Sequence, residues 1–231
     1  MKPDIDSRIF IIADIHGCNR TFRQLLFERI KLVKSDILYL LGDYIDRGPD
    51  SKGVLNTIIE LQRDGYDIRP ILGNHEDLLL QTIRTGKDQD LWDWFDNGGR
   101  ETLKSYEVDH PDDIPEDHIK FLETLPLYRT TDTHLFVHGG LDFFLDNPLS
   151  IEGRNSMLWE RQVKVETDKI GGRKLVTGHT IKDIDEIIES LDSDLIQLDN
   201  GCFMGSQYEG RGNLVALELE SGNLLIQNNI E

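Results

Sequence analysis

Short apolar segments alternate with helical patterns along the first 72 residues of the sequence. Buried strands are predicted where these segments are richest in Ile and Leu, at residues 8–13, 36–41 and 68–72. Between them, apolar side chains recur every three or four residues around 22–33 and 54–61, which predicts two amphipathic helices. Asn19 and Asp50 are expected to cap these helices. The order strand, helix, strand, helix, strand predicts a parallel sheet with right-handed crossovers, and hence an α/β fold.

The second half of the sequence is richer in strands. Residues 75–125 are mostly helical in pattern, and Trp92, Trp94 and Phe95 are interpreted there as core residues. After this region, six strands without long helices between them are predicted at residues 127–131, 135–138, 174–177, 195–198, 214–219 and 224–227. Because no linker or repeat divides the chain, residues 1–231 are predicted to form one domain, with a sheet-on-sheet core and helices outside.

Composition excludes several classes of protein. The net charge of −18 repels polyphosphate backbones, so we expect no nucleic-acid binding. No apolar run approaches the length of a membrane span, and the first residues lack the apolar core of an export signal, so the expected location is the cytoplasm, without membrane attachment. The two cysteines, Cys18 and Cys202, have neither disulfide-framework nor zinc-knuckle spacing, which fits a reducing compartment.

Each short run of Asp, Asn and His in the sequence follows a predicted strand and is flanked by glycine. Five such runs occur: Asp14-Ile15-His16-Gly17, Gly42-Asp43-Tyr44-Ile45-Asp46-Arg47-Gly48, Gly73-Asn74-His75-Glu76, Val137-His138-Gly139-Gly140 and Thr177-Gly178-His179. Ligands of α/β folds bind at strand ends, so these runs can converge on one pocket.

The residue types in these runs favour a metal site. Carboxylate, amide and imidazole groups without thiolate suit Mn, Fe or Zn ions and disfavour a structural zinc site. Six candidate ligands are present: Asp14, His16, Asp43, Asn74, His138 and His179. Six are too many for one catalytic ion, so we predict two divalent cations, with Asp43 as the best candidate for a bridge at a separation of about 3.5–4 Å. His110, His118 and His134 lie outside the runs and are interpreted as ordinary surface or turn histidines.

Together the five runs resemble the phosphoprotein phosphatase (PPP) family, and most closely its bacterial and bacteriophage lambda-type serine/threonine phosphatases, within the calcineurin-like metallophosphoesterases. The resemblance spans residues 8–201. It implies a central β-sandwich of two mixed sheets flanked by helices, and a dinuclear site that usually works with manganese. By this likeness Asp14 and His16 bind the first ion, Asp43 bridges, and the second ion is held by Asn74, His138 and His179.

The resemblance and the chemistry together suggest roles for the remaining polar residues. Arg47 can offer a bidentate fork to phosphate oxygens, and Arg161 matches a second phosphate-binding arginine of the bacterial members. Asn74 is expected to contact the phosphate as well. His75, oriented by Asp46, is the expected general acid for the leaving group. The implied mechanism is direct attack of a metal-bound hydroxide on phosphorus.

The predicted function is therefore hydrolysis of phosphomonoesters, with phosphoserine and phosphothreonine in proteins as the main substrates. The first alternative is a symmetrical bis(5'-nucleosyl)-tetraphosphate hydrolase. Those enzymes typically lack the aspartate found here as Asp46 and have Asp where this chain has Glu76, which favours the protein-phosphatase interpretation. The minor alternative is a catalytically silent metal-binding module. We expect a phosphoprotein or small phosphorylated substrate as partner, and a monomer or weak oligomer.

One segment departs from the bacterial pattern. Where those relatives commonly carry Asp-Thr-Gly, this chain has Asp199-Asn200-Gly201, followed by a glycine-containing loop. Tyr208 and Arg211 could reach over the pocket from that loop, but the favoured interpretation is a solvent-exposed turn.

Overall fold

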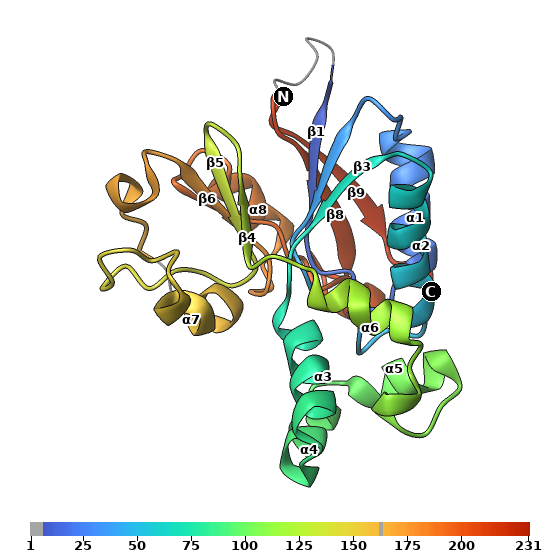
Figure 1. The fold of residues 1–231 in the computed structure, drawn as a ribbon. Coiled ribbons are helices and arrows are strands. Elements are labelled where there is room, and N and C mark those ends of the chain that lie inside the picture. The colour runs from blue at the N-terminus through green and yellow to red at the C-terminus, as the bar shows by residue number, and fades with distance from the viewer. Residues whose placement is uncertain (1–6, 162–163) are drawn as a thin grey trace.

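The computed structural model describes residues 7–161 and 164–231 and places two β-sheets face to face, with helices on the outside (Figure 1). The five-stranded sheet has the order β3-β2-β1-β8-β9 and the four-stranded sheet the order β4-β5-β6-β7. The strands are β1 (Ile9–Ile12), β2 (Ile37–Leu40), β3 (Asp67–Pro70), β4 (Tyr128–Thr130), β5 (His134–Val137), β6 (Lys174–Thr177), β7 (Leu195–Gln197), β8 (Asn213–Glu218) and β9 (Asn223–Asn228).

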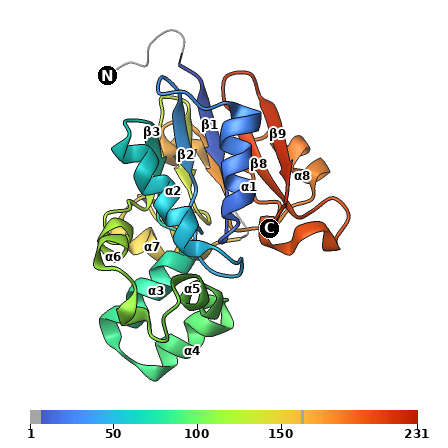
Figure 2. The ribbon, with the colours of Figure 1, turned by 90° about the vertical axis from the view of Figure 1, so that its right-hand side faces the viewer.

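The helices lie on both sides of this pair of sheets. The α-helices are α1 (Asn19–Gln24), α2 (Ser51–Arg63), α3 (Asn74–Thr85), α4 (Asp88–Asp96), α5 (Gly99–Tyr106), α6 (Glu116–Glu123), α7 (Arg154–Trp159) and α8 (Ile184–Ser190). A π-helical turn, η1 (Leu25–Ile30), continues α1, and short 3-10 turns are η2 (Pro111–Asp113), η3 (Ile151–Gly153), η4 (Thr167–Ile170) and η5 (Cys202–Gln207). Figure 2 shows α3, α4 and α5 gathered below the sheets, whereas α1 and α2 cover the outer face of the five-stranded sheet. None of the described helices is long and apolar enough to cross a membrane.

Both sheets are mixed, as predicted. β1 pairs in parallel with β2, and β2 with β3, whereas β1 and β8 are antiparallel. In the second sheet β5, β6 and β7 are parallel and β4 runs against them. Three carboxyl strand ends therefore meet at one edge of the first sheet and three at one edge of the second.

Successive side chains along β1 point to opposite faces of the sheet and pack into two different hydrophobic cores. Ile9 and Ile11 face the other sheet, where they pack in one apolar cluster with Phe136 and Val176. Phe10 and Ile12 face the helices instead. This two-sided burial is the reason that the strand is apolar throughout rather than alternating.

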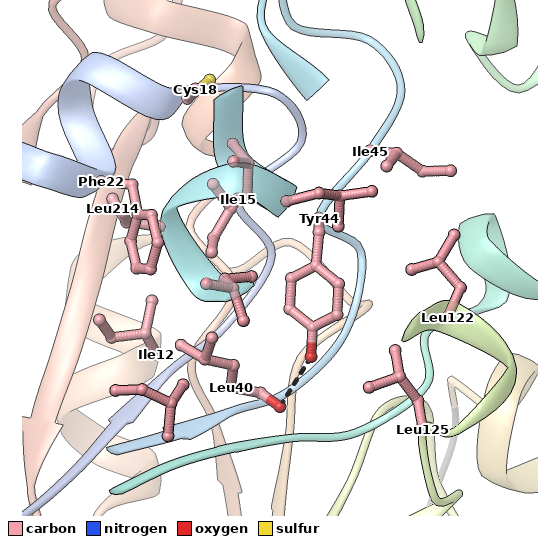
Figure 3. Packing of buried hydrophobic residues seen from close by; sticks show 14 of the residues in the cluster. Ile12, Ile15, Cys18, Phe22, Leu40, Tyr44, Ile45, Leu122, Leu125 and Leu214 are labelled. Atoms are coloured by element: carbon pink, nitrogen blue, oxygen red, sulfur yellow. Dashed lines mark hydrogen bonds between the residues drawn. The ribbon is translucent and has the colours of Figure 1, made fainter. Parts of the chain in front are cut away.

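The loop after β2 is anchored in the helix-side core by Tyr44. Its ring is fully buried, and its hydroxyl lies 2.7 Å from the carbonyl oxygen of Ile71 and 3.1 Å from that of Leu40 (Figure 3). Because the same hydroxyl accepts the N–H groups of Gly42 and Ile71, one side chain joins the loops that follow β2 and β3.

Four local predictions were wrong. Asn19 does not cap α1 but begins it, since its amide bonds Thr57 and Asp50 on the neighbouring segment. Val33 lies beyond the helical turn and is 48% exposed. Trp92 is 54% exposed, because its face of α4 turns to solvent. His118 is no surface histidine: it is buried and bonds Tyr106 and Asn56.

Candidate metal centre and active site

All five sequence runs converge on one buried site at the strand ends. Asp14 follows β1, Asp43 follows β2, Asn74 begins α3 after β3, and His138 and His179 follow β5 and β6. The six predicted ligand side chains are all buried.

Potential ligand atoms in this site form two groups that share Asp43. One group contains His16, Asp43 and His75, and the other contains Asp43, His138 and His179. The two carboxylate oxygens of Asp43 face different groups. Oδ2 lies 3.5 Å from Nε2 of His16, and Oδ1 lies 3.3 Å from Nε2 of His138. A carboxylate that turns one oxygen to each side is suited to bridge two cations.

The remaining two predicted ligands border the groups. Oδ2 of Asp14 lies 4.0 Å from Nε2 of His16, and both of its oxygens accept the backbone N–H of His179. Oδ1 of Asn74 lies 2.7 Å from Nε2 of His138. Asn74 therefore contacts the second group directly.

The imidazoles of His16 and His138 are oriented by the backbone. Nδ1 of His16 donates to the carbonyl oxygen of Ile45 at 2.9 Å, and Nδ1 of His138 donates to that of Leu41 at 2.8 Å. Such outer hydrogen bonds fix which ring nitrogen points at a metal. In both residues it is Nε2 that points into the site.

His179 gives an independent test of whether a cation fits. Its Nε2 atom is buried and has no hydrogen-bond partner within the described residues, although buried polar atoms are nearly always paired. The atom belongs to the group of Asp43 and His138. An unpaired imidazole nitrogen beside a carboxylate is what a divalent cation would complete, so the residues present fit a metal site.

Burial and neighbouring charges shift the pKa values of several candidate ligands. Burial opposes ionisation of Asp43, but the neighbouring His138 and His75 lower its pKa well below the usual range. Burial and the charge of His138 lower the pKa of His179 to about 3. Burial also lowers the pKa of His16 well below its usual value. His16 and His179 are therefore neutral at pH 7, the form that binds metal.

The backbone is strained at these positions. Of seven non-glycine residues with positive φ in the described chain, five belong to the site: His16, Asp43, Asp46, Arg47 and His179. Side chains disfavour this left-handed region, and such strain persists only where the surroundings enforce it. Close packing explains one of the flanking glycines, because a Cβ on Gly178 would lie 2.2 Å from a carboxylate oxygen of Asp14.

Glu76 holds the strained loop around Asp43. Its buried carboxylate accepts four backbone N–H groups, from Asp43 and Gly73 on Oε2 and from Tyr44 and Ile45 on Oε1, at 2.7–3.2 Å. Burial and the charge of Asp43 raise the pKa of this carboxyl to about 7. The fourth residue of the Gly-Asn-His-Glu run thus ties two site loops together.

Replacing Glu76 with glutamine is expected to lower the free energy of unfolding by about 2–4 kcal/mol, because the new amide NH₂ meets two buried N–H donors. Urea denaturation of the metal-free protein at pH 8, where the carboxyl is ionised, measures this change. Glu101→Gln is the control, since Glu101 pairs with Lys104 at the surface and the substitution should change stability by less than about 0.5 kcal/mol. Equal denaturation midpoints for the two variants would contradict this role.

His75, a member of the first group of potential ligands, forms a buried dyad with Asp46. Nδ1 of His75 lies 2.7 Å from Oδ2 of Asp46, and Nε2 points to Oδ2 of Asp43 at 3.7 Å. Burial opposes protonation of His75, yet the charges of Asp43 and Asp46 raise its pKa above the usual value. The geometry leaves Nε2 directed into the site.

Two arginines border the site. Arg47 donates to Nε2 of His16 at 2.9 Å, and its guanidinium lies 4.6 Å from the ring centre of Phe203. Arg161 is exposed and donates to the carbonyl oxygen of His179 at 2.8 Å. Both guanidinium groups therefore lie next to a predicted metal ligand.

Sequence reasoning missed four residues near the site. Trp94 and Thr102 bond Asp46, and Phe203 packs against His16 and Arg47. Asp199 is a buried carboxylate, and burial together with the charge of Asp199 raises the pKa of Asp14. Trp94 is a core residue, as predicted, but it also has a polar partner. Only Asp199 carried a signal, since it follows the predicted strand at 195–198.

The loop after β7 contacts the site through a residue other than Tyr208 and Arg211, the two considered from the sequence. Tyr208 is 54% exposed, and Arg211 pairs with Asp183 rather than with the ligands. From this loop it is Phe203, in η5, that contacts His16.

Comparisons with known proteins agree with this geometry. The symmetrical bis(5'-nucleosyl)-tetraphosphatase of Wigglesworthia glossinidia brevipalpis is 42% identical over 84 residues, which are 35% of this chain and 30% of that protein. Serine/threonine-protein phosphatase 2 of Escherichia coli (strain K12) is 32% identical over 126 residues, which are 49% of this chain and 55% of that protein. The chain thus matches less than two thirds of the length of these curated relatives.

The fold is shared with a solved serine/threonine phosphatase from Saccharomyces cerevisiae. The TM-score is 0.64 at 16% identity, and the match covers 100% of this chain and 82% of the other. The family model for calcineurin-like phosphoesterases matches residues 7–192, which include all six candidate ligands. The fold has two mixed sheets, its Asp, Asn and His side chains converge on one site, and the family model matches most of the sequence. The chain therefore belongs to the calcineurin-like phosphoesterase family.

Proposed function

We propose that the protein is a metal-dependent phosphatase that hydrolyses phosphomonoesters with poor leaving groups, such as phosphoserine and phosphothreonine. The observation that carries this proposal is the buried dyad of Asp46 and His75, joined at 2.7 Å. An alkoxide leaves slowly unless it is protonated, so an oriented acid is of most use for an alkyl phosphate.

Two divalent cations fit the paired groups. Asp14 and His16 would hold one, His138, His179 and Asn74 the other, and Asp43 would bridge them. When bound, such ions supply Lewis acidity, which lowers the pKa of water and neutralises phosphoryl charge. Manganese is the first metal to test, with iron and zinc as alternatives.

The protein's own groups handle charge and proton transfer. Arg47 and Arg161 bind the equatorial phosphate oxygens, together with the amide of Asn74. Arg47 contacts Nε2 of His16 at 2.9 Å, and because His16 would use this nitrogen to hold a cation, the guanidinium of Arg47 would then be free to bind phosphate. His75 delivers a proton from Nε2 to the leaving oxygen while Asp46 keeps Nδ1–H bonded.

A second candidate function is symmetrical dinucleoside tetraphosphate hydrolysis. It is favoured by several curated relatives that carry this name, such as the protein from Acidovorax sp. (strain JS42), which is 43% identical over 72 residues. It is disfavoured by the presence of Asp46 and by a net charge of −18, which repels a polyanionic nucleotide.

Initial rates of hydrolysis distinguish the two candidate functions. The purified, metal-stripped protein is supplied with Mn²⁺ and assayed on a phosphoserine peptide and on diadenosine tetraphosphate side by side. We expect faster hydrolysis of the peptide. Faster hydrolysis of the nucleotide would make the second candidate correct, and binding of metal without activity on either substrate would indicate a silent module.

A further inference from the structure

The carboxylate of Asp46 is enclosed by donors from three separate elements. Besides His75 on α3, the indole Nε1–H of Trp94 on α4 lies 3.1 Å from Oδ1 and 3.0 Å from Oδ2. The hydroxyl of Thr102 on α5 donates to Oδ1 at 2.7 Å. Asp46 is 0% exposed and Trp94 and Thr102 are each 0% exposed. These three donors together fix where each oxygen of the carboxylate points.

The same hydroxyl also fixes the backbone. The N–H of Asp46 donates to Oγ1 of Thr102 at 2.9 Å and to Oγ of Ser51 at 3.0 Å. The N–H of Arg47 donates to the carbonyl oxygen of Gly98, between α4 and α5, at 3.3 Å. Asp46 and Arg47 both have positive φ. Helices α4 and α5 therefore hold two consecutive strained residues in place.

Close packing places the indole and the hydroxyl together. A Cβ on Gly99, the first residue of α5, would lie 2.4 Å from the ring of Trp94. Without a side chain at this position, α5 can start directly against the indole, and Thr102 follows one turn later. A phenylalanine in place of Trp94 would fill most of the same volume but could not donate a hydrogen bond to Asp46. Apolar packing alone therefore does not account for a tryptophan at this position.

We propose that Trp94 and Thr102 are positioning residues for acid catalysis. They hold the carboxylate of Asp46 in a fixed orientation so that His75 presents Nε2 to the leaving oxygen, and they thereby set how well the enzyme cleaves esters with poor leaving groups. This inference rests on the proposed function, because it acts through His75 as the proton donor. In the step concerned, a water-derived oxygen bonds to phosphorus as the ester P–O bond breaks, the proton moves from Nε2 of His75 to the departing oxygen, and His75 is left neutral.

The leaving group tests this proposal. The 4-nitrophenolate ion needs little protonation, whereas the serine alkoxide of a phosphopeptide needs much. Trp94→Phe and Thr102→Val are expected to lower kcat on the phosphoserine peptide by about 10-fold or more, and kcat on 4-nitrophenyl phosphate by less than about 3-fold, with KM nearly unchanged. Trp92→Phe is the matched control, because Trp92 lies on the same helix, is 54% exposed and should change neither rate.

A double-variant cycle tests the route. In a His75→Asn background, Trp94→Phe should cause no further loss, since the residue through which it acts is already gone. An equal loss on both substrates, or a full additional loss in the His75→Asn background, would overturn the proposal and leave Trp94 a structural residue.

Proton NMR gives a readout that does not depend on turnover. The wild-type protein loaded with diamagnetic Zn²⁺ is expected to show a downfield resonance of the His75 Nδ1 proton bonded to Asp46. Trp92→Phe should keep this resonance, while Trp94→Phe and Thr102→Val should shift or broaden it; an unchanged resonance in these two variants would overturn the proposal. Wild-type rates alone decide the proposed function, so that result and the failure of this inference are distinguishable.

Discussion

His75→Asn is expected to reduce turnover of a phosphoserine peptide by about 100-fold or more while leaving the metal content unchanged. Asparagine keeps a polar side chain of similar reach but has no proton to donate at physiological pH. The loss should be much smaller for 4-nitrophenyl phosphate, because nitrophenolate departs without a proton. Rates on both substrates and metal analysis of the same preparation test the prediction.

Metal analysis is needed because His75 also lies near the ligand atoms. It belongs to the group with His16 and Asp43, and its Nε2 is 3.7 Å from Oδ2 of Asp43. If His75 were a ligand, the variant would lose metal and activity on both substrates together. His134→Asn is the control, since His134 lies at the start of β5 and bonds Thr133 instead of the site.

Asp43→Asn is expected to weaken both metal sites together, each by more than about 100-fold, and to abolish metal-dependent activity. Asp43 is the one residue common to both ligand groups, and each of its oxygens faces a different histidine. The amide NH₂ of asparagine cannot bind a cation, and losing even an outer-shell partner costs 10- to 100-fold in affinity.

Isothermal titration with Mn²⁺, together with metal analysis after dialysis, measures this loss. His179→Asn supplies the comparison, because His179 belongs to only one group and should weaken only one ion. Asp109→Asn, at an exposed position, should change neither. Retention of two tightly bound ions by the Asp43 variant would remove the bridging role.

The names of the relatives point to two substrate classes for this chain, phosphomonoesters and dinucleoside tetraphosphates. A protein named as a nucleotide hydrolase and one named as a protein phosphatase both match part of this chain, over 35% and 49% of its length. A metal centre alone does not choose between them. The acid dyad and its supports on α4 and α5 lie outside the ligand set, which is why the leaving-group experiment bears on specificity as well as on mechanism.

Much of the fold and the ligand set could be predicted from the sequence because both are encoded locally. A buried strand is apolar on both faces, and a site residue follows its end within a few positions, so Asp14, Asp43 and His138 each stand next to a recognisable strand. Their residue types alone indicated divalent metal ions. The order of helices and strands in the first 72 residues predicted the parallel part of the five-stranded sheet.

The tertiary structure alone decided which side chains support the dyad of Asp46 and His75. Trp94 and Thr102 are 48 and 56 residues away from Asp46 in the sequence, and no spacing rule links them. The Asn19 cap and the surface position of His118 were wrong for the same reason, since their partners come from distant segments. Strand periodicity is a local property of the chain, whereas the hydrogen bonding of a buried carboxylate depends on which elements pack around it. The sequence by itself therefore determined the candidate ligands, and only packing determined how Asp46 and His75 are held.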